Sequence, residues 1–155
     1  MTQTVRAATQ EDVAALTALE LAFPEEDRFS RRTWQRLLRG NSAILVSDGE
    51  AGLAGALVLL FRRTSRIARI YSISVAEAAR GTGLSDKLLS ESEAISRQRG
   101  CVAIRLEVRE TNSRAKRLYE RHDYRVMARA AGYYPDGETA LRMEKPLTGF
   151  SREDQ

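Results

Sequence analysis

The chain has 155 residues, a length that suits one domain around a single core, and we expect residues 1–155 to form one domain with its core at about 4–147. Its 43% hydrophobic and 30% charged residues are ordinary for a soluble globular protein. The net charge is +4, but the charges are spread along the chain, so we do not expect nucleic acid as a partner.

The first part of the chain predicts a strand and two short helices. Val5–Ala7 has the pattern of a short strand. Thr9 is a predicted N-cap with Asp12 at the third helical position, and the helix that follows ends at Pro24. Ser30 is expected to cap a second helix.

The rest of the chain alternates strands with helices. Strands at Ala43–Val46 and Leu53–Phe61 flank a hairpin turn expected at Ser47–Glu50. The remaining predicted elements are, in chain order, a strand at Ile67–Val75, a helix from about Gly83 to Arg99, a strand at Cys101–Val108, a helix capped by Asn112, and strands at Tyr124–Arg129 and Thr139–Glu144. This order predicts an α/β (α+β) fold with a mixed sheet and helices on both of its faces.

A glycine-rich turn, Arg80–Ser85, connects a predicted strand to a predicted helix. Glycines let backbone N–H groups approach a ligand closely, and a helix N-terminus adds about half a positive charge. The turn is therefore expected to bind an anion. Alone it is a weak signal, because a plain strand-to-helix turn also uses glycine.

Residues at fixed distances after this turn make the pattern specific. They are Leu106-Glu107-Val108-Arg109, then Asn112, then Leu118-Tyr119-Glu120, then Tyr124. Together with the turn they resemble the GCN5-related N-acetyltransferase (GNAT) superfamily, over nearly the whole chain from Val5 to Leu147. The resemblance implies a single-domain, mostly antiparallel sheet of about seven strands that splays between the fourth and fifth strands. It also implies transfer of an acetyl group from acetyl-coenzyme A to a primary amine, by direct attack in a ternary complex.

The resemblance implies a set of cofactor-binding residues. Backbone groups of Ile73, Ser74 and Val75 would bond the pantetheine arm and stabilise the developing oxyanion, although Ile73 and Val75 also suit a core. The other implied contacts are Arg80, Gly81, Thr82, Gly83, Leu84, Ser85, Asn112 and Tyr119. Ser85 departs from the Gly or Ala usual in the family, and an N-cap role alone explains Asn112.

Two residues are candidates for proton transfer. The resemblance implies that Tyr119 donates a proton to the departing thiolate and that Glu107 acts as general base. The alternative for Tyr119 is a half-buried side chain packed on the sheet. For Glu107 it is a structural carboxylate paired with Arg105 or Arg109, or a solvated edge.

Residues near the C-terminal end of the chain indicate the class of acceptor. Tyr133 and Tyr134, followed by Asp136-Gly137, resemble ribosomal-protein alanine N-acetyltransferases and related protein N-terminal acetyltransferases. The resemblance implies that the tyrosines hold a peptide backbone. Glu25 and Glu26 could face the acceptor ammonium, or form a solvated turn. The expected acceptor is a protein or peptide N-terminal α-amine; a small-molecule amine and a non-catalytic acyl-coenzyme A sensor stay open.

The remaining expectations concern surroundings and partners. The longest apolar run, Leu53–Phe61, is too short to span a bilayer, and no signal peptide is expected, so we expect a cytoplasmic protein without a membrane partner. Cys101 is the only cysteine, which excludes an intrachain disulfide and a cysteine-based zinc site, and no metal is expected. The sequence leaves a monomer and a homodimer open.

Overall fold

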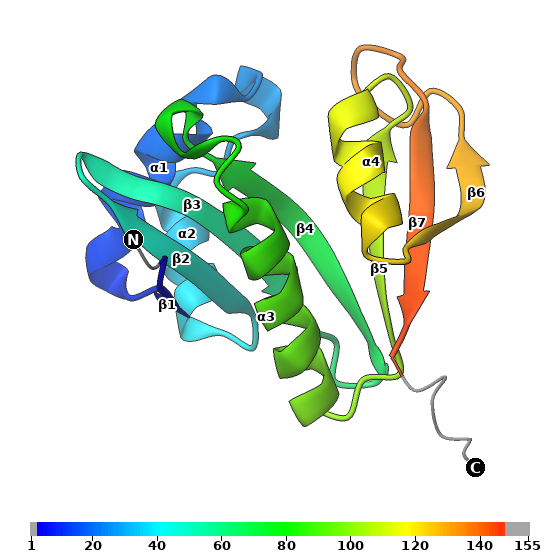
Figure 1. Cartoon of the computed structure of the whole chain (residues 1–155), viewed down its shortest axis with the longest axis horizontal. Coiled ribbons are helices and arrows are strands. Elements are labelled where there is room, and N and C mark those ends of the chain that lie inside the picture. The colour runs from blue at the N-terminus through cyan, green and yellow to red at the C-terminus, as the bar shows by residue number, and fades with distance from the viewer. Residues whose placement is uncertain (1–2, 148–155) are drawn as a thin grey trace. The chain divides into compact units, whose positions relative to one another are not determined.

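The computed structural model describes residues 3–147, and these divide into two compact units (Figure 1). The first unit takes the residues up to Phe61 together with Ser72–Ser92. The second takes Arg62–Tyr71 and the residues from Glu93 onward. A single domain over residues 1–155 stays a prediction, and residues 1–2 and 148–155 of that range lie outside the described part.

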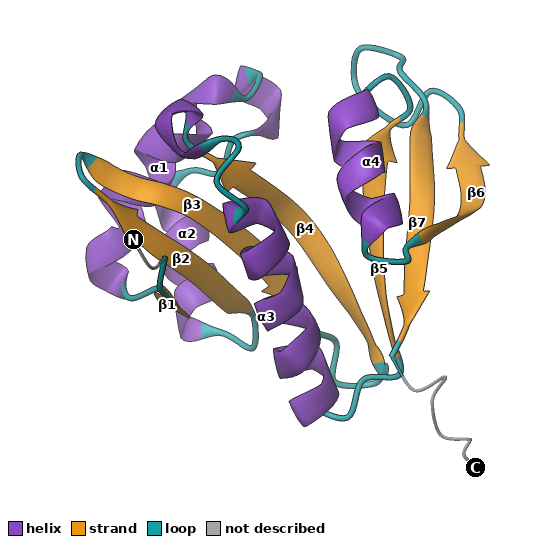
Figure 2. Ribbon diagram, viewed as in Figure 1, coloured by secondary structure: helices purple, strands orange, loops and turns teal. Residues whose placement is uncertain are grey.

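Residues 3–147 form seven strands and four α-helices, together with short 3₁₀ turns (Figure 2). The strands are β1 (Val5–Ala7), β2 (Ala43–Gly49), β3 (Gly52–Leu60), β4 (Ile67–Val75), β5 (Ala103–Arg109), β6 (Arg125–Ala130) and β7 (Ala140–Pro146). The helices are α1 (Val13–Leu19), α2 (Arg31–Arg39), α3 (Leu84–Gln98) and α4 (Ser113–Arg121). The hydrogen-bonded order is β1-β2-β3-β4-β5-β7-β6, with β4 and β5 parallel and the pairs β1–β2, β2–β3, β5–β7 and β6–β7 antiparallel. The predicted mixed, mostly antiparallel sheet is confirmed.

The parallel pairing of β4 with β5 is short. It runs from Ile67 opposite Ala103 to Ile70 opposite Leu106, which is the beginning of each strand. Both strands continue beyond this register, β4 to Val75 and β5 to Arg109. A register confined to the strand beginnings agrees with the expected opening of the sheet between its fourth and fifth strands.

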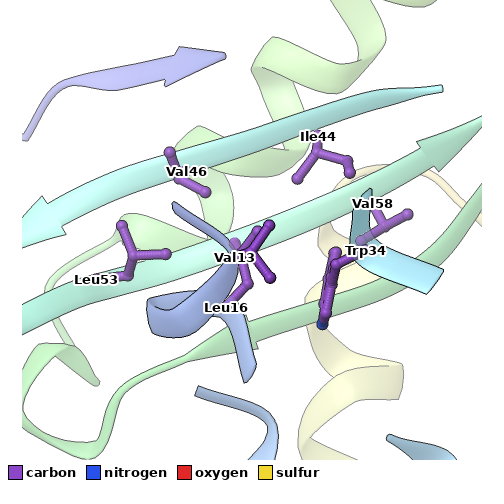
Figure 3. Packing of buried hydrophobic residues seen from close by; sticks show 8 residues of the cluster. Val13, Leu16, Trp34, Ile44, Val46, Leu53 and Val58 are labelled. Carbon is purple, nitrogen blue, oxygen red and sulfur yellow. The ribbon is translucent and has the colours of Figure 1, made fainter. Parts of the chain in front are cut away.

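The core of the first unit lies between helices and the β2–β3 hairpin (Figure 3). The buried cluster joins α1, α2, β2 and β3 and consists of Val13, Leu16, Trp34, Ile44, Val46, Leu53, Ala56 and Val58. Gly55 borders α3 instead, because a Cβ there would stand 2.9 Å from Leu84 Cδ2 and 3.1 Å from the Ser74 carbonyl oxygen. Helices therefore cover both faces of this hairpin, as predicted.

Strand β5 separates apolar from charged residues in the second unit. Ile104, Leu106 and Val108 are buried, whereas Arg105, Glu107 and Arg109 are only partly buried. Successive side chains of a strand point to opposite faces. The three charged residues therefore share one face of β5, and this face carries most of the candidate chemistry.

The hairpin turn was predicted at the wrong place. It was expected at Ser47–Glu50, but β2 continues to Gly49 and the turn falls at residues 50–51. Ser47 is buried, and Asp48 accepts hydrogen bonds of 2.9 Å from Arg6 on β1, so both polar residues have reasons to stay in the strand. A register shift between Ser47 and Asp48 accommodates the longer hairpin.

The predicted caps are confirmed, but the first helix is interrupted. The Thr9 N–H donates to Asp12 Oδ2 at 2.7 Å, which completes the expected capping box. Ser30 Oγ accepts from the Thr33 N–H at 3.1 Å. The first helix is α1 flanked by 3₁₀ turns at Gln10–Asp12 and Glu20–Ala22 instead of one continuous helix. Within residues 3–147, the helices include none with the length and apolar character needed to cross a bilayer.

Candidate functional site

Glu107 lies on the charged face of β5 with its side chain only 11% exposed. Its Oε1 accepts a hydrogen bond of 2.7 Å from Arg69 Nη2 on β4. Its Oε2 accepts one of 2.9 Å from Arg142 Nε on β7, the residue directly opposite in the antiparallel register. A mostly buried carboxylate needs such partners, and here each oxygen has a guanidinium donor.

These partners correct the expected pairing of Glu107. Arg105 bonds Glu144 at 2.7 Å, and Arg109 bonds Asp136 at 2.8 Å. Cross-strand neighbours approach more closely than residues two apart along one strand, so the carboxylate pairs across the sheet and not along β5.

Arg69 also connects Glu107 with the predicted acceptor loop. Its Nη2 donates to the Tyr133 hydroxyl at 3.4 Å in addition to Glu107 Oε1. The hydrogen bond from Arg142 to Glu107 raises the pKa of Arg142, and the nearby Tyr133 raises it further. Arg142 therefore stays charged near Tyr133.

Arg109 organises the loop that joins β6 to β7. Its Nη1 lies 2.8 Å from Asp136 Oδ2 and 3.2 Å from Glu138 Oε1, and its guanidinium carbon lies 4.0 Å from the centre of the Tyr134 ring. The rings of Tyr133 and Tyr134 meet edge to face, with centres 5.1 Å apart. The tyrosine pair is thus held by specific contacts to β5.

Tyr119 lies in α4 and is 5% exposed. Its ring packs edge-on against Tyr124, with centres 5.8 Å apart. Burial raises the pKa of its hydroxyl well above the usual range, and the neighbouring Tyr134 adds to the effect. The hydroxyl is therefore protonated at neutral pH and can donate a hydrogen bond, while the raised pKa makes it a weaker acid than a free tyrosine. Within the second unit, Glu107, Tyr133, Tyr134 and Tyr119 form one connected group.

Asn112 occupies the N-cap of α4. Its Oδ1 accepts a hydrogen bond of 3.1 Å from the Ala115 N–H. The cap interpretation is confirmed, and the contact with pantetheine stays a prediction.

The glycine turn of the first unit has the backbone that the anion-binding interpretation requires. Gly81 and Gly83 have φ values of +78° and +86°, a conformation that other residues adopt only with strain. Both are exposed, and α3 begins directly after them at Leu84. The first N–H groups of a helix have no acceptor within the helix, so donors gather here at an accessible positive helix end.

Side chains of the turn contribute less. Thr82 Oγ1 donates to the Ala79 carbonyl oxygen and accepts from Gln3 Nε2 at 2.8 Å, so its hydroxyl has local partners. Arg80 is exposed and Ser85 is partly buried in the first turn of α3. Their contacts with a phosphate stay predictions.

The remaining expected site residues lie in the first unit. Ile73, Ser74 and Val75 at the end of β4 are all partly buried, so this segment is not simply core. Glu25 and Glu26 are exposed in a 3₁₀ turn at Glu25–Asp27, and their approach to an acceptor ammonium stays a prediction.

The family is decided by a match over most of the chain. The model of the acetyltransferase (GNAT) family matches residues 10–124. The chain belongs to this family. Its similarity to named relatives is more local: an N-alpha-acetyltransferase of Saccharolobus solfataricus is 36% identical over 83 residues, and one of Sulfolobus acidocaldarius is 37% identical over 83 residues. These matches cover 53% of this chain and 50% and 49% of the relatives, so the chain spans about half the length of the curated relatives it matches.

Solved structures share the GNAT fold over nearly the whole chain. Ard1 from Thermoplasma volcanium has a TM-score of 0.83 at 23% identity, covering 95% of this chain and 99% of that one. The ribosomal-protein-S18-alanine N-acetyltransferase from Escherichia coli has a TM-score of 0.82 at 24% identity, covering 94% of both chains. A chain of the NatC complex bound to Gag peptide and CoA has a TM-score of 0.80 at 24% identity, covering 96% of this chain and 100% of that one. At these identities the likeness establishes the fold alone.

Sequence reasoning missed the arginines that shape the GNAT chain's candidate site. Arg69 and Arg142 hold Glu107, and Arg109 holds the tyrosine loop. A signal was present, because each arginine interrupts a largely apolar strand, and two of these strands, β5 and β7, also carry carboxylates. To use that signal one must know the register of β4, β5 and β7, which local sequence patterns do not determine.

Proposed function

We propose that the chain is an acetyl-coenzyme A-dependent N-acetyltransferase whose acceptor is the α-amine at a protein or peptide N-terminus. Family membership and the names of the archaeal relatives support this proposal. The observation that carries it is the group in the second unit in which Arg69 joins the Glu107 carboxylate to the Tyr133–Tyr134 pair, with the buried Tyr119 near enough to Tyr134 for its pKa to be affected.

The first unit would hold the cofactor. When bound, acetyl-coenzyme A supplies an acetyl group activated as a thioester. We assign the pyrophosphate to the turn Arg80–Ser85 and the N-terminus of α3, where exposed N–H groups favour an anion. Backbone groups of Ile73, Ser74 and Val75 would hold the pantetheine arm, and the N–H groups near Ser74 would stabilise negative charge on the carbonyl oxygen.

The second unit would move the protons. An α-ammonium has a pKa near 8, so Glu107 needs to take only one weakly held proton before the amine attacks the thioester carbon. The new C–N bond would replace the C–S bond, and Tyr119 would donate its proton to the departing thiolate. The second proton released by the attacking nitrogen would restore the proton of Tyr119. The two guanidinium contacts fix the orientation of Glu107, and each carboxylate oxygen keeps a second lone pair for the incoming proton.

The tyrosine pair would bind the acceptor. Tyr133 is 44% exposed, and its hydroxyl reaches Arg69, the partner of Glu107. A peptide backbone bonded to Tyr133 would therefore bring its amine toward the carboxylate. The cytoplasmic location and the oligomeric state remain predictions.

The test measures thiol release from acetyl-coenzyme A with two acceptor pools. One pool holds short peptides with free N-termini, including peptides that begin with alanine, and the other holds amino acids, polyamines and aminoglycosides. Faster release with the peptides is the expected result. Thiol release with free amines alone would contradict a peptide acceptor. No thiol release with either pool, together with tight cofactor binding, would indicate a sensor.

A further inference from the structure

The two arginines around Glu107 have more hydrogen-bond donors than the structure uses. A guanidinium carries five N–H donors. Arg69 uses Nη2, while its buried Nε finds no acceptor within residues 3–147. Arg142 bonds Glu107 through Nε, and its Nη1 and Nη2 have no hydrogen bond within residues 3–147. These donors stand beside a carboxylate that is already satisfied by one bond to each oxygen.

The same group carries an excess of positive charge. Arg69 and Arg142 contribute two positive charges against the single negative charge of Glu107. The side chains of Arg69 and Arg142 are 43% and 38% exposed, whereas Glu107 is 11% exposed, so the cations are more accessible to solvent than the carboxylate. The neighbouring Arg105 forms its own ion pair with Glu144 and leaves this excess in place.

We propose that Arg69 and Arg142 form a carboxylate-recognition site, so that the enzyme prefers acceptor N-termini carrying Asp or Glu in the first two residues. This inference rests on the proposed function, because it takes the amine to be delivered to Glu107. The planar guanidinium fork matches a carboxylate in two parallel hydrogen bonds.

The short distance between Glu107 and the two arginines limits the preference for acidic side chains to the first residues of the peptide. The guanidinium nitrogens lie 2.7 and 2.9 Å from the Glu107 oxygens, and an extended chain advances about 3.3–3.6 Å per residue. An amine at Glu107 therefore places the side chains of its first two residues within reach of the arginines. A lysine at these positions would meet like charge and bind less well.

The experiment compares kcat/KM for peptides that differ at one position only, with Glu, Gln or Lys as the second residue after alanine, and with Glu or Gln as the first. The wild-type chain is expected to favour Glu over the isosteric Gln by about tenfold, mainly through KM. Lys should be the poorest second residue. The preference should shrink as salt is raised, because exposed charges are screened.

Single substitutions test whether the preference for acidic peptides depends on Arg142. Arg142→Gln should reduce the Glu-to-Gln ratio toward one, and Arg142→Lys should keep part of it, because the charge remains while the fork is lost. Arg125→Gln, which removes an exposed cation of β6 in the same unit, should keep the full ratio. Thermal melting checks that each variant is folded, and the wild-type peptide and salt series decides the question if Arg142→Gln does not fold.

The outcomes separate this inference from the proposed function. Equal kcat/KM for Glu and Gln peptides in the wild-type chain, or an unchanged ratio in folded Arg142→Gln, would overturn the carboxylate site while leaving peptide acetylation intact. Absence of thiol release with every peptide would instead overturn the proposed function on which the inference rests.

Discussion

At the scale of single residues, burial decides which side chains can transfer protons. Tyr119 is almost fully buried, and burial raises its pKa, so its hydroxyl stays protonated until a thiolate departs but is a weaker acid than a free tyrosine. The Glu107 side chain is mostly shielded from solvent, and two guanidinium donors supply the hydrogen bonds that a carboxylate loses on leaving water. The two residues therefore suit opposite directions of proton transfer.

Replacing Tyr119 by Phe tests the donor role directly. The ring contact with Tyr124 is kept and only the hydroxyl is lost, so kcat should fall by about a hundredfold with little change in stability. Thiol release with a peptide acceptor measures the effect. Tyr124→Phe is the matched control, because it removes the hydroxyl of the neighbouring buried tyrosine and should keep most of the activity. Equal kcat values for Tyr119→Phe and the wild-type chain would exclude the donor role.

Glu20 gives a residue-scale prediction about pH and stability. It is 3% exposed, its Oε1 accepts from the Phe29 N–H at 2.8 Å, and burial raises its pKa. The folded state then holds this proton more tightly than the unfolded state. The contribution of Glu20 to the free energy of unfolding is therefore most favourable below its unfolded pKa and falls as pH rises through the window up to the folded pKa.

Glu20→Gln removes this titration. The free energy of unfolding of the variant should exceed that of the wild-type chain at neutral pH. The difference should narrow as pH falls from the raised folded pKa of Glu20 to about 4.3, the ordinary pKa of a glutamate, and should be small below it. Urea unfolding across this pH range measures it. A difference between the two proteins that is independent of pH would contradict the assignment.

At the scale of elements, residues in the left-handed conformation border both ends of α3 and the C-terminal end of α4. Helix α4 ends in a Schellman motif, in which the Tyr124 N–H bonds the Tyr119 carbonyl and the Asp123 N–H bonds the Glu120 carbonyl, each at 3.0 Å. Asp123 has a φ of 70° at the position where glycine is the usual residue. Aspartate at this position therefore still allows the left-handed turn to form.

Asp123→Gly should stabilise the protein. Glycine adopts the left-handed conformation without steric cost, so the free energy of unfolding should rise by about 0.5–1 kcal/mol. Asp123→Val is the opposite control, because a β-branched residue fits this conformation poorly and should lower stability. Urea denaturation compares the three proteins, and a loss of stability on Asp123→Gly would show that the aspartate side chain itself stabilises the turn.

Substitutions at the two glycines before and after α3 distinguish the effect of backbone strain on stability from an effect on ligand binding. Gly83 and Gly100 have φ values of +86° and +81°, and a Cβ on either would meet nothing within 4 Å. Replacing either by Ala should cost about 1–2 kcal/mol of stability through left-handed strain. Only Gly83→Ala should also weaken coenzyme A binding, measured by calorimetry on folded protein. Equal affinity in Gly83→Ala and Gly100→Ala would remove the turn from the cofactor site.

At the scale of the whole molecule, local signals predicted the elements and long-range pairing decided the site. The caps at Thr9, Ser30 and Asn112 follow from side chains within three residues, and the structure confirms all three. The partners of Glu107 come from strands 38 and 35 residues away in sequence, so they follow only from the register of the sheet. The same reason explains the misplaced hairpin turn, where the cross-strand partner Arg6 keeps Asp48 in β2.

The measurement that tests the central claim most directly locates the acetyl group on the product. A peptide that contains one internal lysine and a free N-terminus is incubated with the chain and acetyl-coenzyme A, and fragmentation mass spectrometry finds the modified nitrogen. We predict a single acetyl group on the α-amine, with the lysine side chain unmodified. Acetylation of the lysine alone, or an unmodified peptide while a small amine is acetylated, would contradict N-terminal acetylation.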